Sequence, residues 1–221
     1  MKNITIQKLI LASQSPRRKE LLEQAGVSFD IVPADIEEII MPSELPDEYV
    51  KRLSREKAIF VSKLIEKSPI PTNILDNKAV FTNSLFTCSS VTWTLGADTT
   101  VVMGDHLLEK PTSNDDARRM LQTLSGQTHI VYTGFTLCSE NREKVITHSV
   151  KTDVSFKNLT RNEIEWYIST GEPFDKAGGY AIQGLGAFMV KSINGSYSNV
   201  VGLPVCEVME VLMQEHIIKM F

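Results

Sequence analysis

Apolar and polar positions along the first part of the chain predict a strand, a helix and a second strand. Residues 8–13 form a short apolar run that is typical of a buried strand. Ser15 followed by Pro16 predicts a helix start, because serine caps a first turn and proline is tolerated at its first position. Gly26 is expected to end that helix, and residues 29–35 resemble a second strand.

A longer amphipathic helix is predicted over residues 46–66, and the segment after it has no regular period. On the helix, apolar residues recur on one face at Val50, Leu53, Ala58, Val61 and either Leu64 or Ile65. Residues 67–93 hold two prolines, three asparagines and many serines and threonines. This composition predicts an extended loop or a small surface excursion.

The middle of the chain predicts a β-hairpin and a capped helix. Residues 92–103 are rich in β-branched side chains, which favours a strand, and Gly104-Asp105 is typical of a hairpin turn. Ser113 is expected to start a helix, because acidic residues follow in its first turn and Gly126 stands after its end.

Strands and helices continue to interleave toward the end of the chain. The expected elements are strands at 127–139 and 143–157 joined at Glu140-Asn141, a helix capped by Thr160 and Glu163 that stops at Gly171, a strand at 187–193 within the glycine-rich stretch 176–202, and a helix from about Leu203 that buries Val205, Val208, Met209 and Leu212. This alternation predicts a mixed α/β fold.

Composition narrows the class of protein. The 221 residues are 42% hydrophobic and 23% charged, which is ordinary for a soluble globular protein with a sizeable core, in one large domain or two lobes. The formal net charge of −4 disfavours a general nucleic-acid-binding protein, although a small anionic ligand needs only a local cluster of cations.

Cysteine spacing and the lack of long apolar runs point to the cytoplasm. Cys88, Cys138 and Cys206 are odd in number and widely spaced, which favours free thiols in a reducing compartment. The first uninterrupted apolar run, residues 9–12, is too short for a signal-peptide core, and no stretch approaches the length of a membrane-spanning helix. We therefore expect a cytoplasmic protein without a membrane partner.

A first group of candidate site residues lies at the predicted strand-to-helix turn. Ser13 and Ser15 precede Arg17 and Arg18, which stand in the first helical turn. The positive end of a helix dipole disfavours cations there, and a bound polyphosphate would resolve that conflict. The alternative is that both arginines are simply solvated.

Two acidic segments could supply metal ligands. Asp35, Glu37 and Glu38 follow a predicted strand, and such oxygen ligands suit Mg²⁺, although an acidic surface turn has the same composition. Asp98 stands between small residues in a very apolar strand, and an ionised carboxylate in such a place needs a cation. A metal or a lysine would serve, and the alternative is a structural aspartate bonded to local backbone.

Three lysines complete the candidates. Lys57 lies inside the long helix, Lys110 precedes a proline, and Lys176 precedes Gly178-Gly179, where glycine-rich backbone could cradle phosphate oxygens. The P-loop pattern and the GxGxxG dinucleotide pattern are both absent from the sequence. The four histidines show no metal-binding spacing.

Taken in order, these clusters resemble the Maf proteins, a family of nucleoside triphosphate pyrophosphatases. The matching runs are LASQSPRRKELLEQAG (11–26), REKA (55–58), GADTTVV (96–102), EKP (109–111), LSGQTHIVYTG (124–134), GEPFDKAGGYAIQG (171–184) and NGSYSNVVGLP (194–204). The resemblance spans nearly the whole chain, so it implies a single domain over residues 1–221. Relative to the family, residues 67–93 are an insertion that could be an inert loop, touch a partner subunit or shield the cleft.

The resemblance implies a fold and a set of site residues. The fold is an elongated α/β structure with two lobes around a central cleft, similar to that of the inosine triphosphate pyrophosphatases. The catalytic position is Asp98, which could act as proton acceptor or as metal ligand. The positions implied to bind substrate are Arg17, Lys57, Lys110, Thr99 and Gln183, and Ser13, Arg18 and Lys176 join them from the clusters above. The implied metal ligands are Glu38, with Glu37 as its alternative, and Asp98.

The resemblance also implies an activity. The Ile-Gln-Gly run at Gln183 resembles the subfamily that acts on dTTP and UTP, whereas the sister subfamily that prefers 7-methyl-GTP carries a glutamate there. The expected reaction is hydrolysis of dTTP and UTP, or of modified pyrimidine nucleotides, to the monophosphate and pyrophosphate with Mg²⁺ or Mn²⁺, by a homodimer. Two alternatives stay open: a non-catalytic regulator of septum formation, and a pyrophosphatase that prefers other modified nucleotides.

Overall fold

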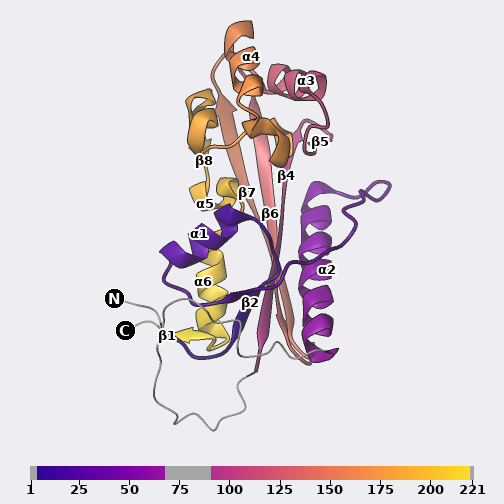
Figure 1. Cartoon of the computed structure of the whole chain (residues 1–221), viewed down its shortest axis with the longest axis vertical. Coiled ribbons are helices and arrows are strands. Elements are labelled where there is room, and N and C mark those ends of the chain that lie inside the picture. Colours follow the sequence, from indigo (N-terminus) through magenta and orange to yellow (C-terminus); the bar gives the residue numbers. More distant parts are fainter. Residues whose placement is uncertain (1–3, 68–90, 220–221) are drawn as a thin grey trace.

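A long mixed sheet runs the length of the molecule in the computed structural model, which describes residues 4–67 and 91–219 (Figure 1). Within these residues the strand order is β3-β2-β4-β6-β7-β8, with β5 paired to β4. The strands are β2 (Leu9–Leu11), β3 (Asp30–Ile31), β4 (Trp93–Met103), β5 (His106–Leu108), β6 (Thr128–Ser139), β7 (Val145–Phe156) and β8 (Val190–Asn194). Strand β2 is parallel to β3 and β4, and the other pairs are antiparallel. The short strands β1 (Ile4–Thr5) and β9 (Ile218–Lys219) pair with each other near the chain ends.

Helices cover the sheet differently at its two ends (Figure 1). The helices are α1 (Pro16–Gln24), α2 (Pro46–Lys67), α3 (Asn114–Leu124), α4 (Arg161–Ser169), α5 (Tyr197–Val201) and α6 (Val205–Gln214), with 3₁₀ turns η1 (Glu172–Asp175), η2 (Ala177–Gly179) and η3 (Gly184–Met189). We call the end that carries α1, α2 and α6 the lower lobe. The end that carries α3, α4 and the 3₁₀ turns is the upper lobe.

Two glycines let α2 lie directly on the sheet. A Cβ atom on Gly96 would stand 2.2 Å from the carbonyl oxygen of Ser54, and one on Gly134 would meet the backbone of the same helix equally closely. Side chains on one face of a strand recur every second residue, so Asp98 shares the face of Gly96. The close approach therefore brings Asp98 next to Lys57 of α2.

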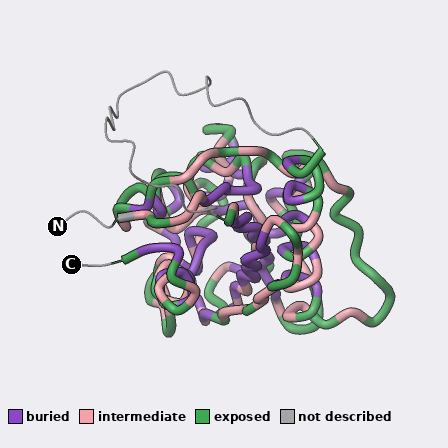
Figure 2. The backbone as a smooth tube through the Cα atoms, turned by 90° about the horizontal axis from the view of Figure 1, so that it is seen from below, coloured by how far each residue is buried: buried purple, intermediate pink, exposed green. Residues whose placement is uncertain are grey.

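The two larger hydrophobic clusters of the described residues, one in each lobe, divide strand β4 between them. Leu95 and Ala97 belong to the lower cluster with residues of α1 and α6. Val101 belongs to the upper cluster with Tyr167 and residues of α3. In Figure 2 the buried segments of the backbone gather toward the middle of the molecule, and exposed segments surround them. Asp98 stands between the two sets on the strand, at the junction of the lobes.

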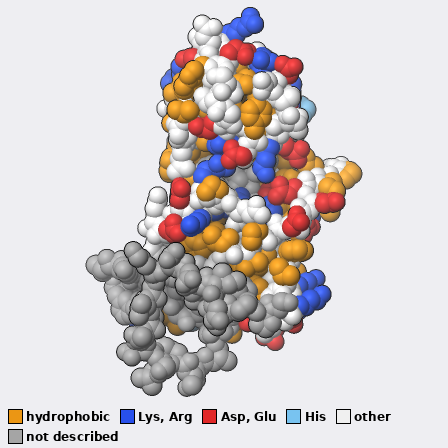
Figure 3. Space-filling model, viewed as in Figure 1, with side chains coloured by type: hydrophobic (Ala, Val, Ile, Leu, Met, Phe, Trp, Pro, Cys, Tyr) orange, Lys and Arg blue, Asp and Glu red, His pale blue; other side chains and the backbone are white. Residues whose placement is uncertain are grey.

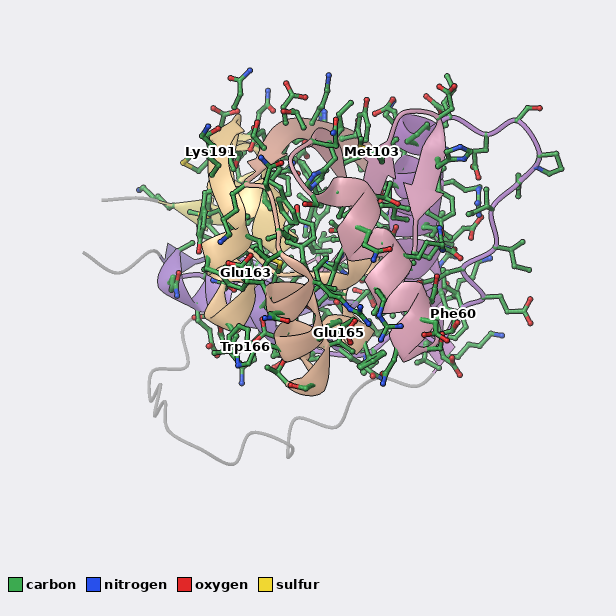
Figure 4. All side chains as sticks on the ribbon, turned by 90° about the horizontal axis from the view of Figure 1, so that it is seen from above. Phe60, Met103, Glu163, Glu165, Trp166 and Lys191 are labelled. Carbon is green, nitrogen blue, oxygen red and sulfur yellow. The ribbon has the colours of Figure 1, made fainter. Side chains whose placement is uncertain are left out.

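The outer surface of the upper lobe carries a partly exposed pair of aromatic side chains. Trp166 on α4 is half exposed, and its ring packs edge-on against Phe188 at 5.7 Å between centroids. Figure 4 looks onto this lobe and labels Trp166 together with Glu163 and Glu165 of the same helix. Among the described residues, none of the helices combines the length and hydrophobicity needed to cross a membrane.

Most of the predicted elements are confirmed. The mixed α/β class, the long helix, the hairpin at Gly104 and the paired strands β6 and β7 are all present. Ser15 and Ser113 accept hydrogen bonds as N-caps, and Thr160 with Glu163 forms the predicted capping box. On α2 the buried position is Ile65, because Leu64 is 45% exposed.

Three predicted boundaries are wrong. The second strand covers only Asp30–Ile31, because its partner β2 ends at Leu11 and Pro33 has no N–H to continue the pairing. The strand predicted at 187–193 begins at Val190, since the preceding residues form the 3₁₀ turn η3, whose Met189 fills the upper core. The final helix starts at Val205 rather than Leu203. The five-residue helix α5 and the short strands β1 and β9 are too brief to show a period in the sequence.

The segment predicted as an inserted loop, 67–93, lies mostly outside the described residues. Its first residue, Lys67, still belongs to α2, and its last, Trp93, already belongs to β4. The predicted segment therefore overlaps α2 by its first residue and β4 by its last residue.

Candidate active site

A cleft of about 490 Å³ opens between the two lobes. Acidic and basic side chains gather around a hollow in the middle of the molecule in Figure 3. Ten of the residues proposed from the sequence line the cleft: Ser13, Arg17, Arg18, Glu38, Lys57, Asp98, Thr99, Lys110, Lys176 and Gln183. Segments far apart in the chain thus meet at one place.

Lys57 is the centre of the charged cluster. Its Nζ atom donates to Asp98 Oδ1 at 2.6 Å and lies 2.5 Å from Glu38 Oε1. The Lys57 and Asp98 side chains are almost fully buried, whereas the Glu38 side chain is 41% exposed. One cation thus balances two carboxylates, which satisfies the requirement that buried charges be paired.

Asp98 has a buried carboxylate, and one of its two oxygens has no hydrogen-bond donor among the described residues. Burial raises the pKa of Asp98, while the charges of Lys57 and Arg18 oppose that rise. Oδ1 accepts from Lys57, and within the described residues Oδ2 accepts no hydrogen bond. This second oxygen is available to a water molecule or a cation.

Glu38, and not Glu37, belongs to the cluster. Partial burial tends to raise the pKa of Glu38, but the charge and hydrogen bond of Lys57 outweigh burial, so the pKa is lowered. Lys110 and Arg18 add to the lowering. Glu37 is exposed and does not line the cleft. The structure therefore favours Glu38 where the sequence left both open.

Arg18 is not solvated, contrary to one sequence interpretation. Its guanidinium donates from Nε to the Gly202 carbonyl at 2.8 Å, from Nη1 to Ser13 Oγ at 3.1 Å and from Nη2 to Thr99 Oγ1 at 3.0 Å. All three acceptors are neutral, and burial lowers the pKa of Arg18. Asp98 and Glu38 interact with this cation only through their longer-range charge. Its charge is therefore available to an anion in the cleft.

Arg17 and Lys176 are both engaged with one carboxylate that sequence reasoning missed. Asp175 Oδ2 accepts from Arg17 Nη1 at 3.2 Å, and Asp175 Oδ1 accepts from Lys176 Nζ at 2.5 Å. Lys176 also donates to the Glu172 carbonyl at 2.6 Å. Asp175 lies inside the 171–184 run that resembles the family, but its residue type alone does not distinguish it from a surface acid.

Glu172 is a second missed residue, and it shapes the loop that presents Gln183. Its carboxylate accepts from the backbone N–H groups of Leu185 and Gly186 and from the Tyr167 hydroxyl. Gly184, with φ of 68°, makes the turn beside it. The Gln183 side chain makes no hydrogen bond within the described residues, so its amide can answer a ligand.

Lys110 faces the same cleft from the loop after β5. It is exposed and makes no ion pair within the part of the chain that the structure describes. A backbone hydrogen bond from Gly178 to the Glu109 carbonyl at 3.1 Å ties this loop to η2. The unpaired ammonium group is free to contact an anion.

The donor set fits a magnesium-like cation only if a ligand contributes. Glu38 and Asp98 bring two carboxylates to one point, and Mg²⁺ is commonly held by one or two carboxylates plus substrate phosphates and waters. Among the described residues, no group of three or more histidine, cysteine, aspartate or glutamate side chains forms a complete protein metal site. The chemistry of the two carboxylates therefore suits a cation that arrives with a phosphate ligand.

Comparisons with known proteins agree on one family. The sequence model of the family described as Maf-like protein matches residues 8–215. A dTTP/UTP pyrophosphatase of Syntrophus aciditrophicus (strain SB) is 45% identical over 206 residues, which cover 93% of this chain and 89% of that protein. A dTTP/UTP pyrophosphatase of Pseudoalteromonas atlantica (strain T6c / ATCC BAA-1087) is 48% identical over 204 residues, which cover 92% and 95%.

One solved structure aligns over most of the length. It is a nucleoside-triphosphatase / dITP/XTP pyrophosphatase from Mycobacterium abscessus, with 10% identity, a TM-score of 0.40 and coverage of 94% of this chain and 93% of that one. A score this low carries no weight for the function of the chain.

Proposed function

This chain belongs to the Maf-like protein family, and from that premise we propose that it hydrolyses dTTP and UTP to the monophosphate and pyrophosphate. The observation that carries the proposal is the convergence of Lys57, Asp98 and Glu38 in a cleft lined by further cations. A nucleoside triphosphate is a concentrated anion, and phosphoryl chemistry depends mostly on positioning and charge neutralisation.

The cations are assigned to the triphosphate. Lys57 and Lys110 lie close to Glu38, and Arg18 reaches the cleft from α1 without forming an ion pair to any described residue. Ser13 and the start of α1, which Ser15 caps, add polar groups and the positive end of a helix dipole. Together they hold the phosphates in line with the attacking water.

Asp98 is assigned the role of proton acceptor. Its free Oδ2 accepts a proton from the water that attacks the α-phosphorus, and the bond from that phosphorus to the bridging oxygen breaks as pyrophosphate leaves. Glu38 and Asp98 are also the residues that would hold Mg²⁺ or Mn²⁺. When bound, the metal neutralises phosphate charge and lowers the pKa of a coordinated water. Gln183 would read the nucleobase, and Thr99 and Arg17 are the other positions proposed to contribute to substrate choice.

The proposal extends to the state of the protein. We assign the whole chain to one domain of two lobes that works as a cytoplasmic homodimer on a nucleotide substrate, without a nucleic-acid or membrane partner. The net charge of −4 disfavours a nucleic-acid partner, while five cations, Arg17, Arg18, Lys57, Lys110 and Lys176, line the cleft and suit a small anionic substrate. A regulator of septum formation would need none of the paired charges around Lys57.

A triphosphate panel tests the activity. Purified protein is incubated with UTP, dTTP, CTP, GTP, modified pyrimidine triphosphates and 7-methyl-GTP, with Mg²⁺ or Mn²⁺, and pyrophosphate release is measured. We expect the highest kcat/KM for UTP and dTTP. No release from any nucleotide with either metal would favour the non-catalytic alternative, and a clear preference for another nucleotide would favour the second one.

A further inference from the structure

Asp175 joins the two lobes across the cleft. Its carboxylate takes hydrogen bonds from Arg17 of α1 in the lower lobe and from Lys176, which follows η1 in the upper lobe. The Asp175 side chain is 64% exposed, whereas those of Arg17 and Lys176 are 25% and 10% exposed. Two cations from opposite sides of the cleft therefore converge on one solvent-exposed carboxylate.

Arg17 and Lys176 are arranged as in an anion-binding site, and the Asp175 carboxylate occupies it. Arginine and lysine donors that converge from two directions suit a phosphate group, which offers more oxygens and more charge than a carboxylate. Lys176 would stay in place without Asp175, because its Nζ is also held by the Glu172 carbonyl at 2.6 Å. The site is thus formed in advance on the upper side.

We propose that Arg17 and Lys176 form an anion subsite for the terminal phosphate groups of the substrate, and that Asp175 occupies this subsite until substrate displaces it. The proposal rests on the proposed function for the identity of the anion. It makes Asp175 a residue that limits affinity, although it takes no part in the chemistry.

The energetic scale of the displacement is modest. An ion pair with a solvent-exposed carboxylate is weak, so substrate can replace Asp175 without a large barrier to binding. After the reaction the returning carboxylate competes with pyrophosphate for the same two cations. Asp175 would therefore speed product release at the expense of some affinity.

Binding of inorganic pyrophosphate in the presence of Mg²⁺, followed by calorimetry, tests the proposal without nucleotide turnover. We expect Asp175→Asn to bind pyrophosphate about fivefold more tightly than the wild type, because the competing charge is gone. The gain should shrink when Arg17→Ala is added, because Asp175 then competes for Lys176 alone. Asp153→Asn removes the carboxylate of a surface pair with Lys151 on β7 and should change nothing.

The opposite results would overturn the proposal. Unchanged or weaker pyrophosphate binding by Asp175→Asn would show that the carboxylate does not compete, and an undiminished gain in the Arg17→Ala background would show that Arg17 is not part of the subsite. Asp175→Ser serves as a second variant, and thermal melting checks that each protein is folded. A wild type that binds pyrophosphate but hydrolyses no nucleotide would contradict the proposed function alone, since this measurement needs no catalysis.

Discussion

Lys57 shows how one side chain can organise a site. Its ammonium group balances Asp98 and Glu38 at 2.6 and 2.5 Å. A triphosphate with its metal would bring charges of both signs, so the contacts of Lys57 with the two carboxylates would have to rearrange when substrate binds. Removing Lys57 would leave two carboxylates close together without a partner, which costs several kcal/mol at the order-of-magnitude level.

A substitution at Gln183 tests whether this side chain recognises the nucleobase. A pyrimidine base offers a carbonyl acceptor beside a ring N–H donor, and a neutral amide can answer both, whereas a carboxylate only accepts. We expect Gln183→Glu to lower kcat/KM for UTP and to improve that for 7-methyl-GTP, so the ratio of the two should fall by about tenfold or more. Folding should be unaffected, because the Gln183 side chain makes no hydrogen bond within the described residues. An unchanged ratio means that Gln183 does not read the base.

The burial of His129 makes the stability of the folded protein depend on pH. It is fully buried among Phe156 and Tyr180, and burial lowers its pKa to about 4. Below about pH 6.5 the unfolded chain binds a proton at this histidine and the folded chain does not, so stability falls as pH falls toward 4. The loss is about 3 kcal/mol at most, from the difference between the two pKa values.

Urea unfolding between pH 4 and pH 7 measures this effect. His129→Phe keeps an aromatic ring but cannot take a proton, so its free energy of unfolding should change less over that range than that of the wild type. The variant also leaves the Tyr180 hydroxyl without its partner at 2.7 Å, so its stability at pH 7 should be lower. Equal slopes for the two proteins would mean that His129 does not titrate with unfolding.

At the scale of elements, the contact of α2 with the sheet determines the geometry of the site. A methyl group on Gly96 would meet the Ser54 carbonyl oxygen at 2.2 Å and the Ala58 nitrogen at 2.7 Å, and both are backbone atoms that cannot move independently of the helix. We expect Gly96→Ala to push α2 away from β4, to destabilise the protein by about 1–3 kcal/mol or more, and to lower kcat because Lys57 moves relative to Asp98.

Gly104→Ala is the matched control for that substitution. Gly104 lies in the β4–β5 turn with φ of 61°, and a methyl group added there would meet open space, so the cost is limited to about 1 kcal/mol of backbone strain. Thermal melting and steady-state kinetics with UTP compare the two variants. If Gly96→Ala is as stable and as active as Gly104→Ala, the close approach of α2 does not govern the site.

The sequence predicts elements well where local chemistry determines them. Caps at Ser15, Ser113 and Thr160 are identifiable because a side chain bonds to backbone three residues away. The strand boundary predicted at 187 is wrong, because the apolar residues before Val190 fold as a 3₁₀ turn that fills the upper core. Apolar composition alone does not separate these two outcomes.

The candidate site is predictable as a set of residues and not as a set of contacts. Unusual positions, such as Asp98 in an apolar strand, indicate chemistry from the sequence. The pair of Arg17 with Asp175 joins residues 158 positions apart, and only the folded chain brings them together. For the same reason the choice of Glu38 over Glu37 requires the position of Lys57.

At the scale of the whole molecule, the site lies between two hydrophobic cores. The lower and upper clusters meet along β4 and β6, and the charged residues of the cleft occupy the boundary. An acidic protein thereby presents a local concentration of cations to an anionic ligand while its overall charge stays negative. This distribution fits a nucleotide enzyme better than a protein that binds nucleic acid over a broad surface.

The most direct test of the central claim compares pyrophosphate release from UTP by the wild type and by Asp98→Asn. The substitution keeps the shape of the side chain but removes the charge that would accept the proton or hold the metal. We expect kcat to fall by about 10²-fold or more, with folding retained in a thermal melt, while Asp105→Asn in the exposed β4–β5 turn keeps full activity. Near-normal turnover by a folded Asp98→Asn protein would contradict the account.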